Sequence, residues 1–183
     1  MGYEAAFQKA WLELERLSQE QKFTARFLAD TYEIDLANKK VFSLSCNAIA
    51  PEHVGILILH YLIQKLKGLP LITNDWITFN QLPGGSGYYE AFRKRAIEPI
   101  IAKFANNPGN LLFCLERLKA KKIQYGDSAI VLDVFEQVPV MVCVWGRDEE
   151  FPAEANILFD RSILEIFPTE DIVVMAGFIA KQL

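Results

Sequence analysis

The sequence has few of the residues that build disulfide frameworks and metal centres. It contains three cysteines and two histidines among 183 residues. Cys46, Cys114 and Cys143 are widely spaced, and none belongs to a CxxC motif. An odd number of isolated cysteines argues against disulfides and cysteine-ligated clusters. We therefore expect small hydrophobic core cysteines in a reducing cytoplasm, and no metal site.

Long apolar runs and a leader segment are also missing. The longest apolar run, residues 54–63, is interrupted by His60 and is far shorter than the roughly 20 residues that cross a bilayer. The first residues show no basic segment followed by an apolar one, so we expect neither a secretory signal nor a membrane partner. Position 6 is alanine, where a myristoylation motif at Gly2 requires Ser or Thr.

An excess of basic residues is absent as well. Lys and Arg number 19 against 23 Asp and Glu, which gives a formal net charge of −4. This sign argues against a nucleic-acid partner. The chain is instead rich in hydrophobic residues, at 51%, and can bury enough of them to exclude intrinsic disorder. Its length suits one globular domain, which we expect to span residues 1–183.

Apolar periodicity predicts the elements of the first half. Residues 4–30 follow a helical period. Apolar and polar residues alternate over residues 32–36 and 41–46. This pattern predicts a hairpin with one solvent-exposed face. Pro51 opens an apolar helix that ends near Lys67, and its nearly uniform apolar circumference predicts a buried, central position.

The second half predicts more helices and then a strand meander. A loop over residues 69–87 leads to a helix over 88–104, which Pro99 must kink or restart, and Asn107 is the expected N-cap of a helix to about Lys119. Three β-branched strands and a closing helix follow, at residues 129–135, 138–145, 156–160 and 169–182. We expect an α+β fold in which a mostly antiparallel sheet of about five strands, from the hairpin and the meander, packs with about six helices.

The two histidines do not form a metal site in this reading. His53 and His60 are seven residues apart on one predicted helix, or about 10.5 Å along its axis at 1.5 Å per residue. One ion needs its ligands within about 2.0–2.2 Å, so the pair cannot share a metal. We expect His60 to be a core histidine with a hydrogen-bond partner.

A glycine-rich segment precedes the helix that carries Arg93 and Arg95. Glycines before a helix can aim backbone N–H groups at an anion, and an arginine can add a bidentate contact. The P-loop lysine is missing and no GxGxxG motif fits, so nucleotide binding has little support. The alternative is a flexible turn with Ser86 as N-cap.

Acidic residues and two aromatic residues gather in residues 145–154, and Asp160 ends the following strand. Such a carboxylate cluster could hold a hard cation, raise one pKa for acid–base work, or pair with basic residues elsewhere. The alternative is a charged hairpin loop that keeps the rim of a sheet soluble.

Several short sequence segments occur in an order that resembles that of a known family. They lie at residues 76–79, 82–85, 126–127, 145–154, 158–160 and 168–171. The chain resembles, over nearly its whole length, an uncharacterised family catalogued only as a domain of unknown function and found in anaerobic bacteria and archaea. Some relatives look fused to a cysteine-rich iron–sulfur domain of the corrinoid-protein type, whose cysteines this chain lacks. The resemblance implies a role near cobalamin-type or redox metabolism by association, and it names no reaction.

These observations lead to a soluble, cytoplasmic ligand-binding or accessory protein. We expect its site where residues 76–87 and 145–154 converge beside the sheet, with aromatic walls, arginines for ligand carboxylates or phosphates, and acids that set polarity. The candidate residues are Trp76, Phe79, Gly84, Gly85, Tyr88, Arg93, Arg95, Trp145, Asp148, Glu149, Glu150 and Asp160.

Two alternatives remain open at the level of sequence. One is a metal-assisted hydrolase with Asp148, Glu150 and Asp160 as oxygen ligands. The other is an interaction module whose surplus apolar surface pairs two subunits, or that meets a redox-protein partner. The sequence does not decide whether the chain is an enzyme, and it assigns no cofactor.

Overall fold

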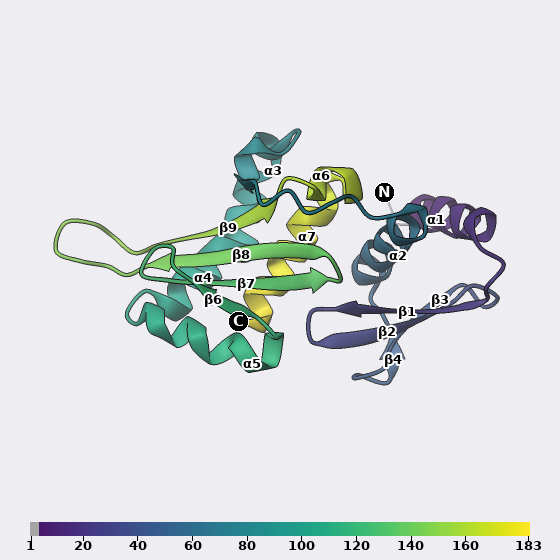
Figure 1. Ribbon diagram of the computed structural model, residues 1–183, viewed down its shortest axis with the longest axis horizontal. Coiled ribbons are helices and arrows are strands. Elements are labelled where there is room, and N and C mark those ends of the chain that lie inside the picture. The colour runs from purple at the N-terminus through teal and green to yellow at the C-terminus, as the bar shows by residue number, and fades with distance from the viewer. Residues whose placement is uncertain (1–3) are drawn as a thin grey trace.

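Two antiparallel sheets organise the chain in the computed structural model, which describes residues 4–183. The first sheet follows helix α1 (Glu4–Leu17) and pairs its strands in chain order. Its strands are β1 (Lys22–Phe27), β2 (Asp30–Asp35), β3 (Lys40–Ser43) and β4 (Ala48–Ile49). Helices α1 and α2 (Glu52–Lys67) accompany this sheet in one part of the molecule (Figure 1).

The second sheet has the strand order β5-β9-β8-β7-β6, with every neighbouring pair antiparallel. Its strands are β5 (Trp76–Thr78), β6 (Lys121–Ile123), β7 (Ser128–Phe135), β8 (Val138–Trp145) and β9 (Glu154–Asp160). Every residue of β8 before Trp145 is buried, as expected for a central strand covered on both faces.

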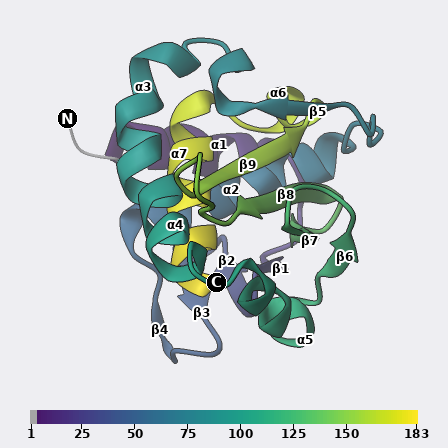
Figure 2. The same ribbon diagram turned by 90° about the vertical axis from the view of Figure 1, so that its left-hand side faces the viewer.

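Helices cover one face of this second sheet (Figures 1 and 2). A long helical segment runs through α3 (Gly85–Phe92), the π-helical turn η2 (Arg93–Ile97) and α4 (Glu98–Phe104). Helix α7 (Thr169–Gln182) lies beside it (Figure 2). Shorter helical pieces are η1 (Phe79–Gln81), η3 (Pro108–Cys114), α5 (Leu115–Leu118) and α6 (Ile163–Ile166).

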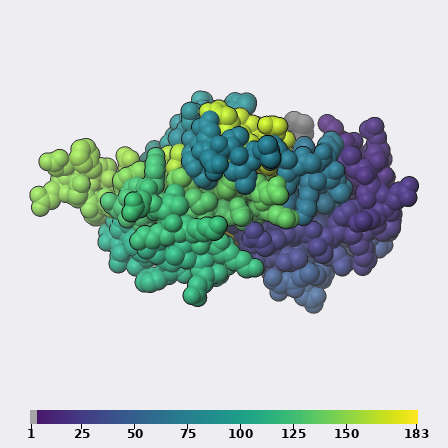
Figure 3. All heavy atoms as spheres, viewed as in Figure 1, coloured from purple at the N-terminus to yellow at the C-terminus, as the bar shows by residue number. Residues whose placement is uncertain are grey.

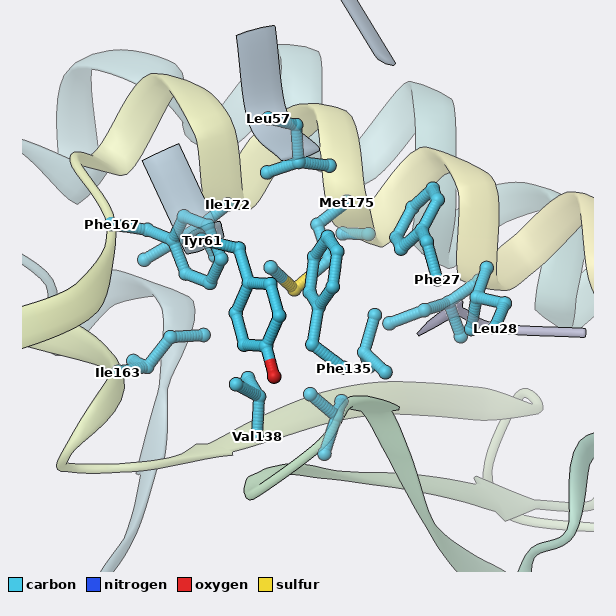
Figure 4. Packing of buried hydrophobic residues seen from close by; sticks show 14 of the residues in the cluster. Phe27, Leu28, Leu57, Tyr61, Phe135, Val138, Ile163, Phe167, Ile172 and Met175 are labelled. Atoms are coloured by element: carbon cyan, nitrogen blue, oxygen red, sulfur yellow. The ribbon is translucent and has the colours of Figure 1, made fainter. Parts of the chain in front are cut away.

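One contiguous cluster of buried side chains joins the two sheets (Figure 4). Phe135 of β7 is stacked between Tyr61 of α2, at 4.3 Å between ring centroids, and Phe27 of β1, at 4.8 Å. The Tyr61 hydroxyl donates to the Glu136 carbonyl oxygen at 3.1 Å. Burial raises the pKa of Tyr61 to about 12, so this hydroxyl remains a donor at neutral pH. Aromatic stacking therefore ties the N-terminal sheet to the C-terminal one.

The α+β class, the antiparallel pairing and the major elements of the prediction are confirmed. The hairpin over residues 32–46, the helix opened by Pro51, the strand pair β7–β8 and the closing helix lie where the periodicity placed them. The hairpin and the meander form separate sheets, however, and β4, β5 and β6 were not expected.

The predicted helix over residues 4–30 is wrong beyond Leu17. Strand β1 occupies residues 22–27 and pairs with β2 over its whole length. Ala25 and Phe27 face the core while Thr24 and Arg26 are more exposed, which is a period of two. The aromatic residues suited either period, and pairing with β2 decided between them.

Proline shapes the long helix in a way that the sequence predicted only in part. Pro99 lies at the start of α4, immediately after the π-helical turn η2. Because proline lacks an N–H and its ring clashes with the carbonyl four residues earlier, a regular helix cannot continue through it. The five-residue π-turn accommodates Pro99 without breaking the segment. The helix is therefore widened at this point.

The expectation of core cysteines is correct for two of the three. Cys114 and Cys143 are buried, whereas Cys46 is exposed in the turn between β3 and β4. Burial raises the pKa of the Cys143 thiol to about 12, which makes it chemically inert at neutral pH.

Candidate functional site

A cavity of about 720 Å³ lies between the α3–η2–α4 segment and the start of β9. Figure 2 shows these two parts of the chain side by side. Residues 78–80, which follow the end of β5, complete the lining together with residues 152–156. The cavity therefore combines the two segments that the sequence predicted would converge.

The cavity borders a part of β9 that has no neighbouring strand. Strand β5 pairs only with residues 158–160 of β9, because the chain turns into η1 after Thr78. The Thr78 N–H donates to the Gln81 side chain at 2.8 Å, which fixes this turn. Within residues 4–183, the Glu154–Asn156 part of β9 thus has a strand on the β8 side only. An open strand edge presents unpaired backbone N–H and C=O groups.

The π-turn sets the charge of the cavity wall. Arg93 at its start and Glu98 just after its end both line the cavity and form an ion pair of 3.5 Å. Both side chains are about half exposed, so water screens this pair and it contributes little to stability. Glu154 on β9 lines the same cavity and has no ion-pair partner within 4.0 Å among residues 4–183. The wall therefore carries one guanidinium and two carboxylates.

Amide side chains add neutral hydrogen-bonding groups. Asn156 accepts the N–H of Ile157 with its oxygen at 2.9 Å, which leaves its NH₂ group for the cavity. Asn80 also lines the cavity, and Ile97 and Ile101 form apolar parts of the wall. This combination suits a small polar molecule that has an apolar part and charges of both signs.

Among the candidate residues from the sequence, Phe79 and Arg93 line this cavity. Sequence reasoning missed Asn80, Glu98, Glu154 and Asn156. Glu98 lies five positions after Arg93, a spacing that a regular helix would place on another face and that the π-turn brings together. Pro99 was the one signal in the sequence, since it indicates an irregularity in the helix without specifying a π-turn.

The two candidate tryptophans lie elsewhere. Trp76 and Trp145 pack against Met141, Cys143 and Leu158 in a smaller apolar cluster, separate from the main core. Trp145 meets the Tyr125 ring edge-on at 5.8 Å. It borders a smaller cavity of about 280 Å³ at the base of the β8–β9 loop, which shares Pro152 and Glu154 with the larger one. Neither tryptophan therefore lines the larger cavity.

Gly84, Gly85 and Tyr88 hold the local fold rather than line the cavity. Gly84 has a positive φ of 71°, in the left-handed region that glycine favours. A Cβ atom at Gly85 would collide with the carbonyl oxygen of Phe79. The Tyr88 hydroxyl donates to Glu170 at 2.7 Å and so connects α3 to α7.

Three of the acidic candidates, Asp148, Glu149 and Glu150, lie in the β8–β9 loop, which projects from one end of the molecule (Figure 3). Asp148 accepts the N–H groups of Phe151 at 2.7 Å and Glu150 at 2.8 Å, and these bonds lower its pKa. Glu149 and Glu150 border the same shallow hollow of about 430 Å³. The arrangement is that of a self-capped, charged turn.

Asp160 is buried at 1% exposure and organises the chain at the other end of β9. It accepts four hydrogen bonds, from the Thr73 N–H and hydroxyl and from the N–H groups of Asn74 and Ser162. Burial alone would raise the pKa of Asp160, but the hydrogen bonds from Ser162 and Thr73 outweigh it and the pKa is lowered.

The proposed metal triad is not assembled. Asp160 ends β9, whereas Asp148 and Glu150 precede its first residue, and the strand alone spans roughly 20 Å at about 3.3 Å per residue. No group of three or more His, Cys, Asp or Glu side chains within residues 4–183 is arranged to hold a metal ion.

His60 has a hydrogen-bond partner, as the sequence predicted, but its side chain is 29% exposed and does not lie in the core. Its Nδ1 lies 2.5 Å from the Asp171 carboxylate and joins α2 to α7. Arg95 and His53 line a different cavity, beside α7.

Comparison with known proteins places the chain in a group without an assigned reaction. No curated protein and no solved structure matches it. None of the helices in residues 4–183 is long and apolar enough to cross a membrane. A family model described as Domain of unknown function (DUF3786) matches residues 8–182, which confirms the expected uncharacterised family. Because this match covers nearly the whole sequence, the chain belongs to the DUF3786 family.

Proposed function

We propose that this protein binds a small zwitterionic ligand, an amino acid or a short peptide, in the cavity between the α3–η2–α4 segment and β9. The observation that carries the proposal is that one cavity has Arg93 and Glu98 on one side and the open edge of β9 on the other.

The charges of the wall support a ligand with both signs. Arg93 can hold a carboxylate through two parallel N–H bonds, the geometry that guanidinium groups favour. Glu98 and Glu154 both line the cavity, and Glu154 has no other ion-pair partner in residues 4–183 to compete for a ligand ammonium group.

The open edge of β9 supports a ligand with amide groups. Extended peptides bind such edges through backbone hydrogen bonds, as an added strand does. Asn80 and Asn156 provide further donors and acceptors at the same place. The volume of about 720 Å³ is within the usual range for small-molecule sites, roughly 300–1,000 Å³, and has room for a few residues.

Isothermal titration calorimetry with trialanine tests this proposal. Trialanine with free termini should bind, and the same peptide with an acetylated N-terminus and an amidated C-terminus should bind about tenfold more weakly or worse, because it lacks both charges. Arg93→Gln and Glu154→Gln should each weaken binding of the free peptide by a similar factor.

The matched controls are Arg147→Gln and Glu150→Gln, which change the same types of residue in the exposed loop outside this cavity. They should leave the affinity unchanged. Absence of binding at millimolar trialanine, or equal binding of the blocked peptide, would contradict the proposal.

The cellular setting is part of the same proposal. We place the protein in the cytoplasm, as a single domain with reduced cysteines. Its link to the redox or corrinoid metabolism of anaerobes rests on the family resemblance alone. An absorption spectrum of protein purified without oxygen tests that link, because a retained chromophore would be visible. Sedimentation equilibrium tests the alternatives of a homodimer or a stable partner.

A further inference from the structure

A second cavity, of about 420 Å³, lies between α7, the π-turn and the first turn of α2. Arg95 of the π-turn, His53 of α2 and Lys181 of α7 supply its polar groups. It shares no residue with the cavity beside β9. The π-turn therefore presents Arg93 to one cavity and Arg95 to the other.

The charge of this second cavity is uncompensated. No carboxylate is among the residues that line it. Within residues 4–183, neither Arg95 nor Lys181 forms an ion pair within 4.0 Å. Two permanent positive charges thus border one hollow in a protein whose net charge is −4. Such a site attracts anions and repels cations.

Apolar groups of α7 form the floor. The ring of Phe178 contacts two of the polar residues: His53 stacks on it at 5.6 Å between centroids, and the Lys181 ammonium lies 5.3 Å from its centroid. Val173, Val174 and Gly177 complete the floor. A Cβ atom added at Gly177 would lie 3.6 Å from the Cβ of Arg95. Because Gly177 has no side chain, the space toward Arg95 stays open.

The first turn of α2 has backbone N–H groups without partners inside the helix. Pro51, its N-cap, makes no side-chain capping bond, and its carbonyl accepts the N–H groups of Val54 and Gly55. The first N–H groups of a helix, here those of Glu52 and His53, have no partner within the helix, and this end carries partial positive charge. His53 places this turn at the rim of the cavity.

We infer that this second cavity is a binding site for a small amphipathic anion. The carboxylate or phosphate head of such a ligand lies between Arg95 and Lys181, and its apolar body lies on Phe178, Val173 and Val174. The inference does not depend on ligand binding beside β9.

Calorimetric titration with three eight-carbon probes tests it. Octanoate and octyl phosphate represent the two kinds of anionic head, and octylamine carries the opposite charge on the same apolar chain. Binding of either anion to one site per chain, with no binding of octylamine, is the expected result. Methyl NMR signals of Val173 and Val174 should shift in the same titration.

Arg95→Gln and Lys181→Gln should each weaken anion binding by about tenfold or more, as expected for loss of a charged hydrogen bond. Both residues are exposed, so the fold should survive, which the melting transition checks. Lys103→Gln is the matched control, because Lys103 lies 5.5 Å over the Phe104 ring in the same manner but borders another cavity.

Three results would overturn the inference: no binding of either anion at millimolar concentration, equally tight binding of octylamine, or equal weakening by Lys103→Gln. The trialanine experiment is separate. Failure of that experiment with retained octanoate binding would remove the zwitterion site alone, and the reverse pattern would remove the anion site alone.

Discussion

At the scale of single residues, Gly85 determines how the chain enters α3 beside the cavity. A side chain there would strike the backbone of Phe79, which cannot move without shifting the adjoining turn. Gly85→Ala should therefore lower the free energy of unfolding by about 1–3 kcal/mol. Gly87→Ala is the matched control, because a Cβ at Gly87 meets nothing within 4 Å. It should raise stability by about 0.5–1 kcal/mol. Urea unfolding measures both, and equal stabilities would contradict the close approach.

Asp160 gives a prediction for stability against pH. Its pKa is lowered in the folded state, so the unfolded state binds the proton more tightly. The stability that it contributes is complete above the ordinary aspartate pKa of about 3.9 and is lost as pH falls through the lowered value. Asp160→Asn should cost about 1–3 kcal/mol at neutral pH, since its NH₂ group cannot accept the Asn74 N–H.

The difference between wild type and Asp160→Asn should narrow in acid, as followed by urea titrations at a series of pH values. Asp148→Asn, in the exposed loop, should change stability less, because both N–H groups donate to Oδ1, which asparagine retains. A constant gap between wild type and Asp160→Asn across the acid range would contradict the assigned role.

Individual roles were predictable where a residue acts within its own segment. The sequence could indicate that Gly84 and Gly85 form a turn and that the segments of Phe79 and Arg93 border the same cavity. It could not indicate that Asp160 accepts hydrogen bonds from Thr73 and Asn74, because those bonds join positions 87 and 86 residues apart. The same limit applied to Trp76 and Trp145, whose face of the sheet depends on strand register.

At the scale of elements, two pairs of ionisable side chains join α2 to the C-terminal half, and they differ in burial. His60 meets Asp171, which is largely buried at the start of α7, whereas Lys65 meets Glu136 at the surface at 2.6 Å. Asp171→Ala should lower the free energy of unfolding by about 1–3 kcal/mol, because His60 loses its partner and α7 loses an acid near its N-terminus.

Glu136→Ala should cost less, because water and salt screen an exposed pair. Thermal denaturation at low and high salt separates the two contacts. The effect of Glu136→Ala should vanish at high salt and that of Asp171→Ala should persist. If the effect of Asp171→Ala vanished at high salt and that of Glu136→Ala persisted, burial would not be what distinguishes the two contacts.

Periodicity predicted elements well where one period was unambiguous. Residues 52–67 and 138–145 offered no competing pattern, and both formed as expected. Residues 22–27 contained aromatic residues compatible with either a helix or a strand, and tertiary pairing made them β1. The π-turn was beyond prediction from period alone, since Pro99 indicated an irregularity without specifying its form.

At the scale of the whole molecule, the stack of Tyr61, Phe135 and Phe27 couples the two sheets. Phe135 is fully buried, so Phe135→Ala should lower the free energy of unfolding by about 3–5 kcal/mol. Phe113, which is 82% exposed, is the matched control, and its replacement by Ala should cost little.

Calorimetry of the wild type should show one cooperative transition, because the buried cluster is continuous through both halves. Two separate transitions, with Phe135→Ala affecting only one of them, would contradict the proposed single domain.

The cavity beside β9 is a property of the assembled molecule. Its residues come from three separated stretches, near positions 78–80, 89–102 and 152–156. Aromatic and charged residues indicated two of these stretches in the sequence. The third contributes Glu98 through a π-turn, and the open edge of β9 exists because β5 ends at Thr78. Neither feature could be predicted before the packing was known.

The most direct test of the zwitterion site is an NMR titration of isotope-labelled protein with free trialanine. The amide signals of Asn80, Arg93, Glu98 and residues 153–156 should shift together and saturate, while signals of the acidic loop tip and of α7 stay in place. Shifts confined to other regions, or none at saturating peptide, would contradict the proposed binding function.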